Sequence, residues 1–347
     1  MTDSKIVAVF PGQGSQHVGM AKELFENFAV ARQVFEEASE AIKTDLKKLC
    51  FDGPESTLTL TENTQPCLLT ASVAAFRVAT QEIGFNPAAV AGHSLGEYSA
   101  LVAAGALPLA TATYWVRERG RAMQTAVPAG QGTMAAIMGL EDDAVIALCR
   151  EATAAAKAKR AQGTSAELTV EAIVEAANFN APGQVVVAGS TDAVAEALAL
   201  ITAAKGTGSA YAGGKAIPLQ VSAPFHCKLM APARDRMAEL FAQAGAADKA
   251  KAPVYPYVPN RTARLTREPG VVFELLVEQV DHPVLWKQSV VALLEGGYTT
   301  AVEVGPGRVL AGLVKRIAQK AVTTGEQPKI LGISDCETLK QTGEGLK

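Results

Sequence analysis

Short apolar runs alternate with longer helical patterns along this chain. The runs predict strands at 6–10, 89–91, 300–304 and 329–333. Apolar residues that recur at three- and four-residue spacing predict amphipathic helices between them, such as 21–38 and 65–83. Strands that alternate with helices are typical of a parallel α/β sheet. Glycine-bearing turns follow the first three strands, at the sheet edge where such proteins bind ligands.

The middle of the chain has a different pattern. Its elements occur in the order strand, helix, strand, strand, helix, strand, with strands at 133–139, 173–178, 184–188 and 216–221 and helices at about 141–158 and 191–204. That order is typical of a small ferredoxin-like subdomain. We therefore predict an α/β core formed by residues 1–130 and 222–347, and an inserted ferredoxin-like subdomain over 131–221.

Two low-complexity stretches lie in this middle part, at 152–165 and 205–215. We interpret them as a helix extension and a mobile surface loop. Lys157, Lys159 and Arg160 in the first stretch are predicted to be solvated surface rather than a contact for an acidic partner.

Composition narrows the class of protein. The chain has 347 residues, of which 48% are hydrophobic and 19% are charged, so it can bury a large core. Its net charge of -3 gives no reason to expect nucleic acid or an anionic membrane as the main partner. No signal-peptide pattern precedes the first strand, and no apolar run has the roughly 18 residues of a membrane span. We expect a cytoplasmic protein.

The five cysteines are widely spread and include no C-x-x-C pair. This odd number and spacing predict reduced thiols and no metal site.

A glycine-bounded motif, G-H-S-L-G at 92–96, lies between a predicted strand and an alanine-rich helical stretch. In the G-x-S-x-G pattern the two glycines leave room for a sharp strand-to-helix turn that exposes the serine hydroxyl. Ser94 is therefore the candidate nucleophile, and the backbone N–H of Leu95 is a candidate oxyanion donor. The alternative is a structural turn without chemistry, because such short patterns also arise by chance.

A serine nucleophile needs a base, and the chain has four histidines: His17, His93, His226 and His282. His93 adjoins Ser94, and neighbouring side chains at a tight turn diverge. His282 precedes a proline, and His17 lies in the first glycine loop. His226 follows a strand-like run and comes after the nucleophile in the chain, as in hydrolases. It is the base favoured by elimination, and the alternative is a buried structural histidine.

Three arginines, Arg117, Arg119 and Arg121, follow the elbow in the helical stretch R-E-R-G-R. At two-residue spacing they point in different directions, so at most one would face a pocket. A guanidinium there would bind a substrate carboxylate through paired hydrogen bonds. The spacing leaves open which of the three does so.

Six ordered motifs together resemble a known family. They are P-G-Q-G-S-Q, G-H-S-L-G-E-Y-S-A-L, R-G-R-A-M-Q, N-F-N-A-P-G-Q-V-V-V-A-G, P-F-H-C-K-L-M and E-V-G-P-G-R-V-L, between about residues 6 and 318. The chain resembles the malonyl-CoA:acyl carrier protein transacylases, the stand-alone acyltransferases of type II fatty acid synthesis. The resemblance implies a hydrolase-like α/β core with an inserted ferredoxin-like subdomain. It also implies malonyl transfer from coenzyme A to the phosphopantetheine thiol of holo acyl carrier protein through a malonyl-serine. We further expect a monomer that uses no metal or cofactor.

The resemblance also implies roles for single residues. Ser94 matches the nucleophile, His226 the base and Arg119 the arginine that pairs with the malonyl carboxylate. Gln13 and Leu95 match the residues whose backbone N–H groups form the oxyanion hole.

Further positions match with other roles. Gln279 matches the residue whose backbone carbonyl orients the histidine, and Asn180 and His93 match positions that line the pocket. Phe225 resembles the malonyl-selective form of related polyketide acyltransferases, so we expect malonyl rather than methylmalonyl. Leu285 stands where a polar residue is common, and the stretches at 152–165 and 205–215 exceed the usual form of the subdomain.

Two other functions remain open at this point. One is an acyltransferase that serves polyketide synthesis, and the other is a serine hydrolase or thioesterase, which would use water in place of the thiol. A nucleotide-binding module is disfavoured, because the glycine loops lack the spacing of the dinucleotide and P-loop motifs.

Overall fold

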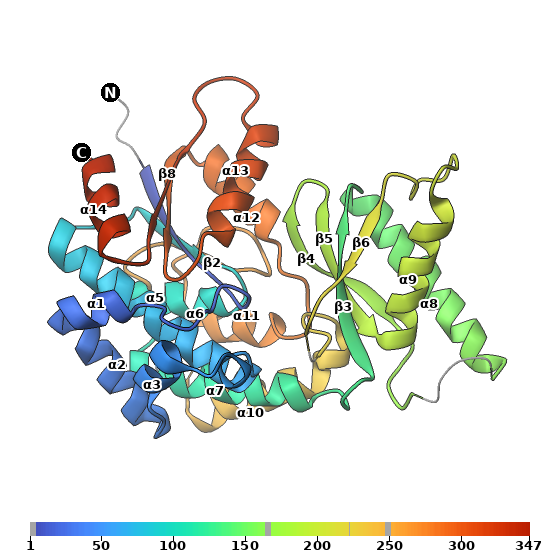
Figure 1. Cartoon of the computed structure of the whole chain (residues 1–347), viewed down its shortest axis with the longest axis horizontal. Coiled ribbons are helices and arrows are strands. Elements are labelled where there is room, and N and C mark those ends of the chain that lie inside the picture. Colours follow the sequence, from blue (N-terminus) through green and yellow to red (C-terminus); the bar gives the residue numbers. More distant parts are fainter. Residues whose placement is uncertain (1–4, 164–167, 222, 247–250) are drawn as a thin grey trace. The chain divides into compact units, whose positions relative to one another are not determined.

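A computed structural model describes residues 5–163, 168–221, 223–246 and 251–347 of the chain (Figure 1). These residues form two compact units, which are described separately below. The first comprises Met1–Arg121, Leu240–Leu275 and Gln288–Lys347, and the second comprises Ala122–Glu239 and Leu276–Lys287. The predicted domain boundaries at 130/131 and 221/222 stay a prediction.

The first unit contains a parallel five-stranded sheet in the order β7-β2-β1-β8-β9. Its strands are β1 (Lys5–Phe10), β2 (Ala89–Gly92), β7 (Tyr257–Val258), β8 (Tyr298–Val304) and β9 (Lys329–Ile333). The predicted parallel α/β sheet is thereby confirmed, and the two-residue strand β7 is an addition that was too short to predict from the pattern.

Helices cover this sheet on both sides (Figure 1). Those with residues in the first unit are α1 (Lys22–Asn27), α2 (Ala29–Ile42), α3 (Leu46–Asp52), α4 (Glu55–Leu58), α5 (Thr61–Ile83), α6 (Leu95–Ala103), α7 (Leu109–Thr125), α10 (Ala231–Gln243), α11 (Val272–Glu278), α12 (Trp286–Glu295), α13 (Val309–Ala321) and α14 (Cys336–Gly345), with a 3₁₀ turn at Pro269–Val271. The helix predicted over 21–38 is two helices, because Phe28 between them has extended backbone. Helix α5 begins four residues before the predicted start.

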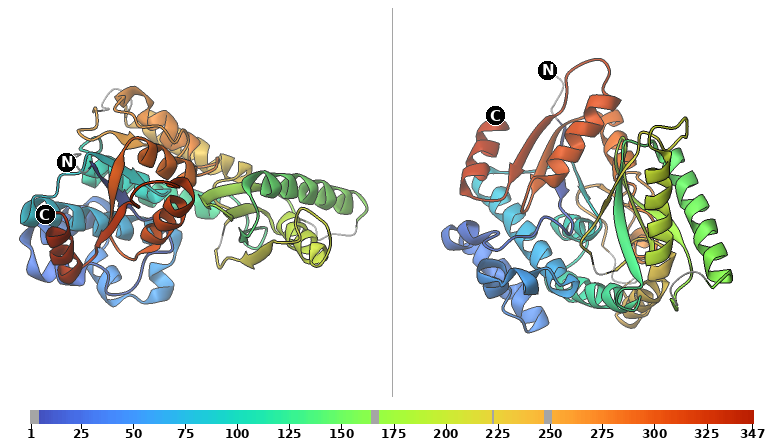
Figure 2. Two further views of the ribbon diagram at one scale, coloured as in Figure 1. Left: turned by 90° about the horizontal axis from the view of Figure 1, so that it is seen from above. Right: turned by 45° about the vertical axis from the view of Figure 1, so that its right-hand side comes forward.

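The second unit contains an antiparallel four-stranded sheet in the order β4-β5-β3-β6. Its strands are β3 (Gly132–Met138), β4 (Val174–Ala181), β5 (Gln184–Ser190) and β6 (Lys215–Pro218), and two helices connect them, α8 (Asp142–Ala161) and α9 (Thr191–Ala204). Figure 2 shows both helices on the same face of this sheet. The element order and the antiparallel pairing confirm the predicted ferredoxin-like arrangement.

Alternating apolar positions of the strands form the core of this second unit. Ala135, Ile137, Val185 and Val187 point to one face, where they pack against α8 and α9 in a single buried cluster that Leu285 also contacts. Strand β6 is shorter than predicted and ends at Pro218, which has no N–H to continue the ladder.

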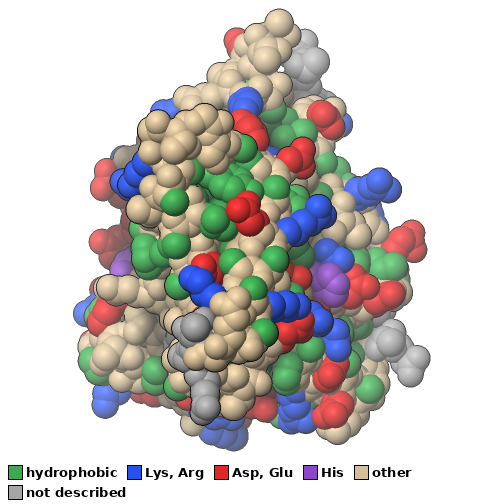
Figure 3. All heavy atoms as spheres, turned by 90° about the vertical axis from the view of Figure 1, so that its right-hand side faces the viewer, with side chains coloured by type: hydrophobic (Ala, Val, Ile, Leu, Met, Phe, Trp, Pro, Cys, Tyr) green, Lys and Arg blue, Asp and Glu red, His purple; other side chains and the backbone are tan. Residues whose placement is uncertain are grey.

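The low-complexity stretches lie on the surface of the second unit. Helix α8 extends through the first stretch to Ala161, as predicted, and residues 164 and 165 at its end lie outside the described residues. Residues 205–213 form mostly exposed turns. Lysine, arginine and acidic side chains are interspersed on the face shown in Figure 3.

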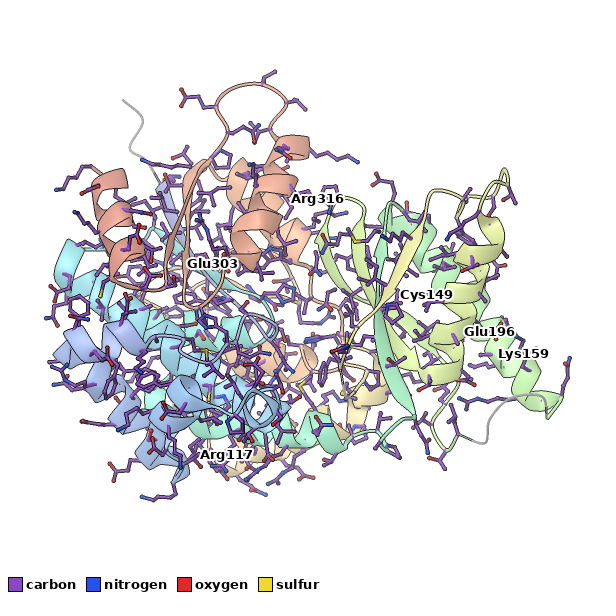
Figure 4. All side chains as sticks on the ribbon, in the orientation of Figure 1. Arg117, Cys149, Lys159, Glu196, Glu303 and Arg316 are labelled. Atoms are coloured by element: carbon purple, nitrogen blue, oxygen red, sulfur yellow. The ribbon has the colours of Figure 1, made fainter. Side chains whose placement is uncertain are left out.

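The three cations of the first stretch make ion pairs within the second unit. Lys159 and Glu196 point toward each other between α8 and α9 (Figure 4). The nitrogen-to-oxygen distances are 3.2 Å for Lys157 to Glu171, 2.6 Å for Lys159 to Glu196 and 2.6 Å for Arg160 to Asp192. Each of these cations therefore pairs with an acidic residue of this chain, and no external acidic partner is needed to neutralise its charge.

Among the described residues, no helix is both long and apolar enough to cross a membrane.

A buried carboxylate joins β8 to α13 in the first unit. Glu303, labelled in Figure 4, accepts backbone N–H bonds from Leu310 at 3.1 Å and Ala311 at 2.8 Å. Burial raises the pKa of this carboxyl, and the two N–H donors oppose that rise. Glu303 thereby caps the helix that follows the G-P-G-R turn.

Helix α6 lies close to β1 and β2 because its first turn contains a glycine. A Cβ atom at Gly96 would lie 2.0 Å from the backbone oxygen of Phe10, and one at Gly92 would lie 2.0 Å from the backbone of Gly96. Real side-chain atoms do not approach a backbone oxygen so closely. The two glycines of the elbow therefore have a packing role.

We predict that Gly96→Ala lowers the free energy of unfolding by about 3 kcal/mol or more, because the methyl group overlaps Phe10. Gly312→Ala in α13 is the matched control, since its Cβ would enter open space; we expect it to raise that free energy by about 0.5–1 kcal/mol. Urea unfolding of both variants measures the difference. Equal stability of the two would contradict the packing described.

Candidate active site

Ser94 occupies a strained turn between β2 and α6. Its backbone has φ 51° and ψ −106°, a positive φ that non-glycine residues rarely adopt, and Leu95 is the first residue of the helix. Strain of this kind clusters at functional sites, where surrounding structure holds it in place. The backbone has the form expected of a nucleophile elbow.

Asn260 holds this turn, and the sequence analysis did not identify it. Its side-chain oxygen accepts the N–H of Ser94 at 2.6 Å, and its side-chain nitrogen donates to the oxygen of Gly92 at 2.6 Å. Its own backbone N–H donates to the carboxylate of Glu97 at 3.0 Å. Asn260 follows strand β7, which pairs with β2 and so brings Asn260 to the turn. A strand of two residues leaves no recognisable pattern in the sequence, so the position of Asn260 was not predicted.

Arg119 lies at the elbow, whereas its two neighbours bind elsewhere. Arg119 is 1% exposed and donates from Nη2 to Ser94 Oγ at 3.1 Å and from Nη1 to Gln65 Oε1 at 2.9 Å. The other two arginines bond to different groups: Arg117 to Ile42 O and Thr44 Oγ1, and Arg121 to Glu62 and Glu118. The spacing left open which of the three arginines faces the candidate nucleophile, and the structure shows that it is Arg119.

Burial lowers the pKa of the Arg119 guanidinium, while the charges of Tyr98 and Glu97 raise it. Its carbon lies 5.7 Å from the centroid of the Tyr98 ring, within range of a cation–π contact. An arginine pKa is so high that the group stays cationic despite this shift. The elbow therefore presents a buried positive charge beside the serine oxygen.

The first glycine loop packs against the elbow. A Cβ atom at Gly12 would lie 2.5 Å from the backbone oxygen of His93, so only glycine allows the two segments to approach this closely. The next residue, Gln13, is exposed, and its side chain donates to Thr61 Oγ1 at 3.4 Å. Gln13 therefore directly follows a residue that packs against His93.

His226 lies in the second unit, 4% exposed, and also has a positive φ of 61°. Its Nδ1 lies 2.8 Å from the backbone oxygen of Gln279, which is fully buried. A carbonyl only accepts, so Nδ1 carries the proton, and in the neutral ring Nε2 is left as the basic nitrogen. The arrangement is that of a base oriented by a carbonyl instead of a carboxylate.

A cavity of about 700 Å³ in the second unit includes His226 in its wall. Two other predicted residues belong to this unit: Phe225 is buried, and Asn180 lies in β4 with its side chain half-buried. The structure thus groups Ser94, Leu95, Arg119 and His93 in the first unit, and His226 and Gln279 in the second.

The cysteines are free, and Cys149 and Cys227 have raised pKa values. All five are free, and burial raises the pKa of Cys149 to about 12 and also raises that of Cys227. Both thiols are therefore protonated near neutral pH. Within the described ranges, no group of three or more His, Cys, Asp or Glu residues is placed to hold a metal ion.

Comparison with known proteins identifies the family. The model of the acyl transferase domain matches residues 7–341, and a malonyl CoA-acyl carrier protein transacylase of Bacillus subtilis (strain 168) is 42% identical over 344 residues, 99% of this chain and 98% of the relative. The chain belongs to the malonyl CoA-acyl carrier protein transacylase family. The predicted class of enzyme, an acyltransferase, is confirmed by this membership.

Other members are similarly close. The transacylase of Escherichia coli (strain K12) is 44% identical over 310 residues, 89% of this chain and 91% of the relative. A solved acyl-carrier-protein S-malonyltransferase from Burkholderia pseudomallei 1710b superposes with a TM-score of 0.84 at 43% identity, covering 98% of this chain and 99% of that one. A malonyl-transacylase solved in complex with a type II PKS acyl-carrier protein superposes with a TM-score of 0.83 at 39% identity, covering 99% and 100%.

We predict that Asn260→Ala lowers the free energy of unfolding by about 1–3 kcal/mol, because the part-buried N–H of Ser94 and the buried oxygen of Gly92 lose their bonds to this amide. Acylation of Ser94 should slow as well, since the elbow loses its support. Asn86→Ala is the control, because that amide bonds only at the surface, to Tyr255, and should change stability by less than about 0.5 kcal/mol. Thermal unfolding and a malonyl-charging assay measure the two effects, and an Asn260→Ala variant that matches Asn86→Ala in both would contradict this role.

Proposed function

We propose that this enzyme transfers malonyl from malonyl-CoA to the phosphopantetheine thiol of an acyl carrier protein, for fatty acid biosynthesis, through a malonyl ester on Ser94. The observation that carries the proposal is the 3.1 Å hydrogen bond between the buried Arg119 guanidinium and Ser94 Oγ. A nucleophile beside a buried cation favours an acyl group that bears its own negative charge. Malonyl is such a group, and acetyl is not.

In the proposed acylation step, Ser94 Oγ attacks the thioester carbonyl of malonyl-CoA as His226 Nε2 accepts the hydroxyl proton. The backbone N–H groups of Gln13 and Leu95 hold the oxyanion that forms. The carbon–sulfur bond then breaks, and His226 returns the proton to the departing thiolate. The products are free coenzyme A and malonyl-Ser94.

In the second step the carrier thiol attacks malonyl-Ser94 while His226 accepts the thiol proton. The ester bond breaks, and the proton passes from His226 to Ser94 Oγ, which restores the free enzyme. The carbonyl of Gln279 keeps the histidine in one tautomer throughout. Two half-reactions that share one covalent intermediate give ping-pong kinetics.

Selectivity in this proposal comes from both ends of the acyl group. Arg119 pairs with the free carboxylate, and Phe225, buried directly before His226, crowds the α-methyl group of methylmalonyl. His93 and Asn180 contribute to substrate binding, as the family resemblance implies.

We propose the partners, the cellular compartment and the oligomeric state of the enzyme as the family suggests. The partners are malonyl-CoA and a holo acyl carrier protein, and the enzyme acts as a cytoplasmic monomer without a metal, a cofactor, nucleic acid or a membrane. Its α/β core is 1–130 and 222–347, with 131–221 as the insertion. The named relatives and the solved carrier complex of one of them support the two partners.

The first test is intact-protein mass spectrometry after brief mixing with malonyl-CoA. We predict a malonyl adduct on the wild type, none on Ser94→Ala, and discharge of the adduct when holo carrier protein is added. Methylmalonyl-CoA should give at least about tenfold less adduct, a difference of about 1.4 kcal/mol. Release of malonate without carrier would indicate a hydrolase instead, and the lack of any adduct would refute the substrate assignment.

A second test concerns Arg119. We predict that Arg119→Ala lowers the preference for malonyl-CoA over acetyl-CoA by about 10- to 100-fold, because the acetyl group no longer leaves a buried guanidinium without a carboxylate. Arg121→Ala is the control, since Arg121 pairs with Glu62 and Glu118 at the surface and should leave the preference unchanged. Competition between the two thioesters in one charging assay measures the ratio. The same ratio in Arg119→Ala and wild type would sink this assignment.

A further inference from the structure

The orientation of His226 depends on a backbone carbonyl, and a carbonyl in a loop must itself be held. Gln279 lies directly after helix α11, and its backbone oxygen lies 2.8 Å from His226 Nδ1, where it orients the ring. A shift of about 1 Å in such a partner can cost about 100-fold in rate. The contacts that hold residues 278–282 therefore bear on the proposed chemistry.

His282 holds the segment around Gln279 in a turn through two short contacts of its imidazole. His282 Nδ1 lies 3.0 Å from the backbone oxygen of Glu278 and 2.7 Å from Asp281 Oδ1. Both partners are acceptors when Asp281 is ionised, so this Nδ1 carries a proton and is shared between them. Gln279 lies within the turn that this bond closes.

An ion pair then fastens the turn to the helix that follows His226. Arg234 of α10 donates from Nη1 to Asp281 Oδ2 at 2.7 Å. The side chain of Asp281 is 4% exposed and that of Arg234 36%, so the contact is partly buried and weakly screened by salt. Arg234 is also fixed by Asp235, which accepts from its Nε and Nη2.

The same residues and His226 line one cavity. His226, Arg234, Asp281 and His282 all line the cavity of about 700 Å³. The pair thus connects the two chain segments that meet at the His226–Gln279 bond.

We propose that Arg234 and Asp281 are positioning residues for the base: their ion pair holds the Gln279 carbonyl against His226 Nδ1. In a conventional triad the surrounding protein fixes the carboxylate that orients the histidine. Here the Arg234–Asp281 pair fixes the Gln279 carbonyl in the same way, and it acts through Gln279 without touching the substrate. This inference rests on the proposed function of His226 and adds the device that fixes its tautomer.

The test compares Arg234→Ala, Asp281→Asn and the conservative Arg234→Lys. We expect kcat for malonyl transfer to fall about tenfold or more in the first two, with KM for malonyl-CoA changed less than about twofold, and partial recovery in Arg234→Lys. The double variant Arg234→Ala/Asp281→Asn should be no slower than either single one, because both remove the same interaction.

Arg160→Ala is the matched control. Arg160 makes a comparable two-bond ion pair with Asp192 in the same unit, at 2.6 and 2.9 Å, but between α8 and α9. We expect its kcat to equal that of the wild type. An equal loss in Arg160→Ala and Arg234→Ala would show a general effect of lost ion pairs and overturn the proposal.

A second readout does not depend on malonyl transfer. In protein labelled with ¹⁵N-histidine, and with the His226 signals assigned from a His226→Ala variant, the wild type should show one tautomer with the proton on Nδ1. Arg234→Ala should shift those signals toward a mixture of tautomers, whereas Arg160→Ala should not. Unchanged His226 signals and unchanged kcat in Arg234→Ala would refute the positioning role. Failure of the wild type to form a malonyl adduct would instead refute the proposed function.

Discussion

The left-handed backbone of Ser94 is the constraint on which the rest of the first unit depends. A serine with φ 51° is unfavourable on its own, and such strain typically costs about 1–3 kcal/mol. The surrounding chain stabilises it from three directions: two glycines allow α6 to approach β1, Gly12 allows the first loop to approach His93, and Asn260 bonds both sides of the turn. The strand order β7-β2-β1 brings these segments together at the carboxyl ends of the strands.

Arg119 adds a second unfavourable contribution, the burial of a charged guanidinium. A guanidinium that is 1% exposed has lost nearly all its water, and its hydrogen-bond partners at the elbow include the neutral groups Gln65 and Ser94. The nearby Glu97 charge counters part of the desolvation. An anionic acyl group would counter it more completely, which gives the proposed selectivity a physical basis.

In the second unit, His226 also has a strained backbone, and its ring is held by a different kind of partner. His226 also has a positive φ, and its ring is oriented by a carbonyl instead of an acid. The ferredoxin-like sheet contributes a stable support, since β4 bonds to the segment after Gln279 through Val284 and its neighbours. Family membership agrees with both units, because relatives match nearly the whole chain and solved members share the fold.

The sequence by itself determined the α/β class, the ferredoxin-like middle and the family, because these follow from periodicity and from motifs that are local in the chain. It also pointed to Ser94 and His226, since a glycine-bounded turn and a short supply of histidines restrict the choice. The spacing left three arginines open and the family resemblance matched Arg119; the tertiary structure added its bond to Ser94 Oγ. Only the tertiary structure showed Asn260 and the Arg234–Asp281 pair. Those contacts join residues far apart in sequence, up to 168 positions for Asn260 and Gly92, and no local pattern encodes such a separation.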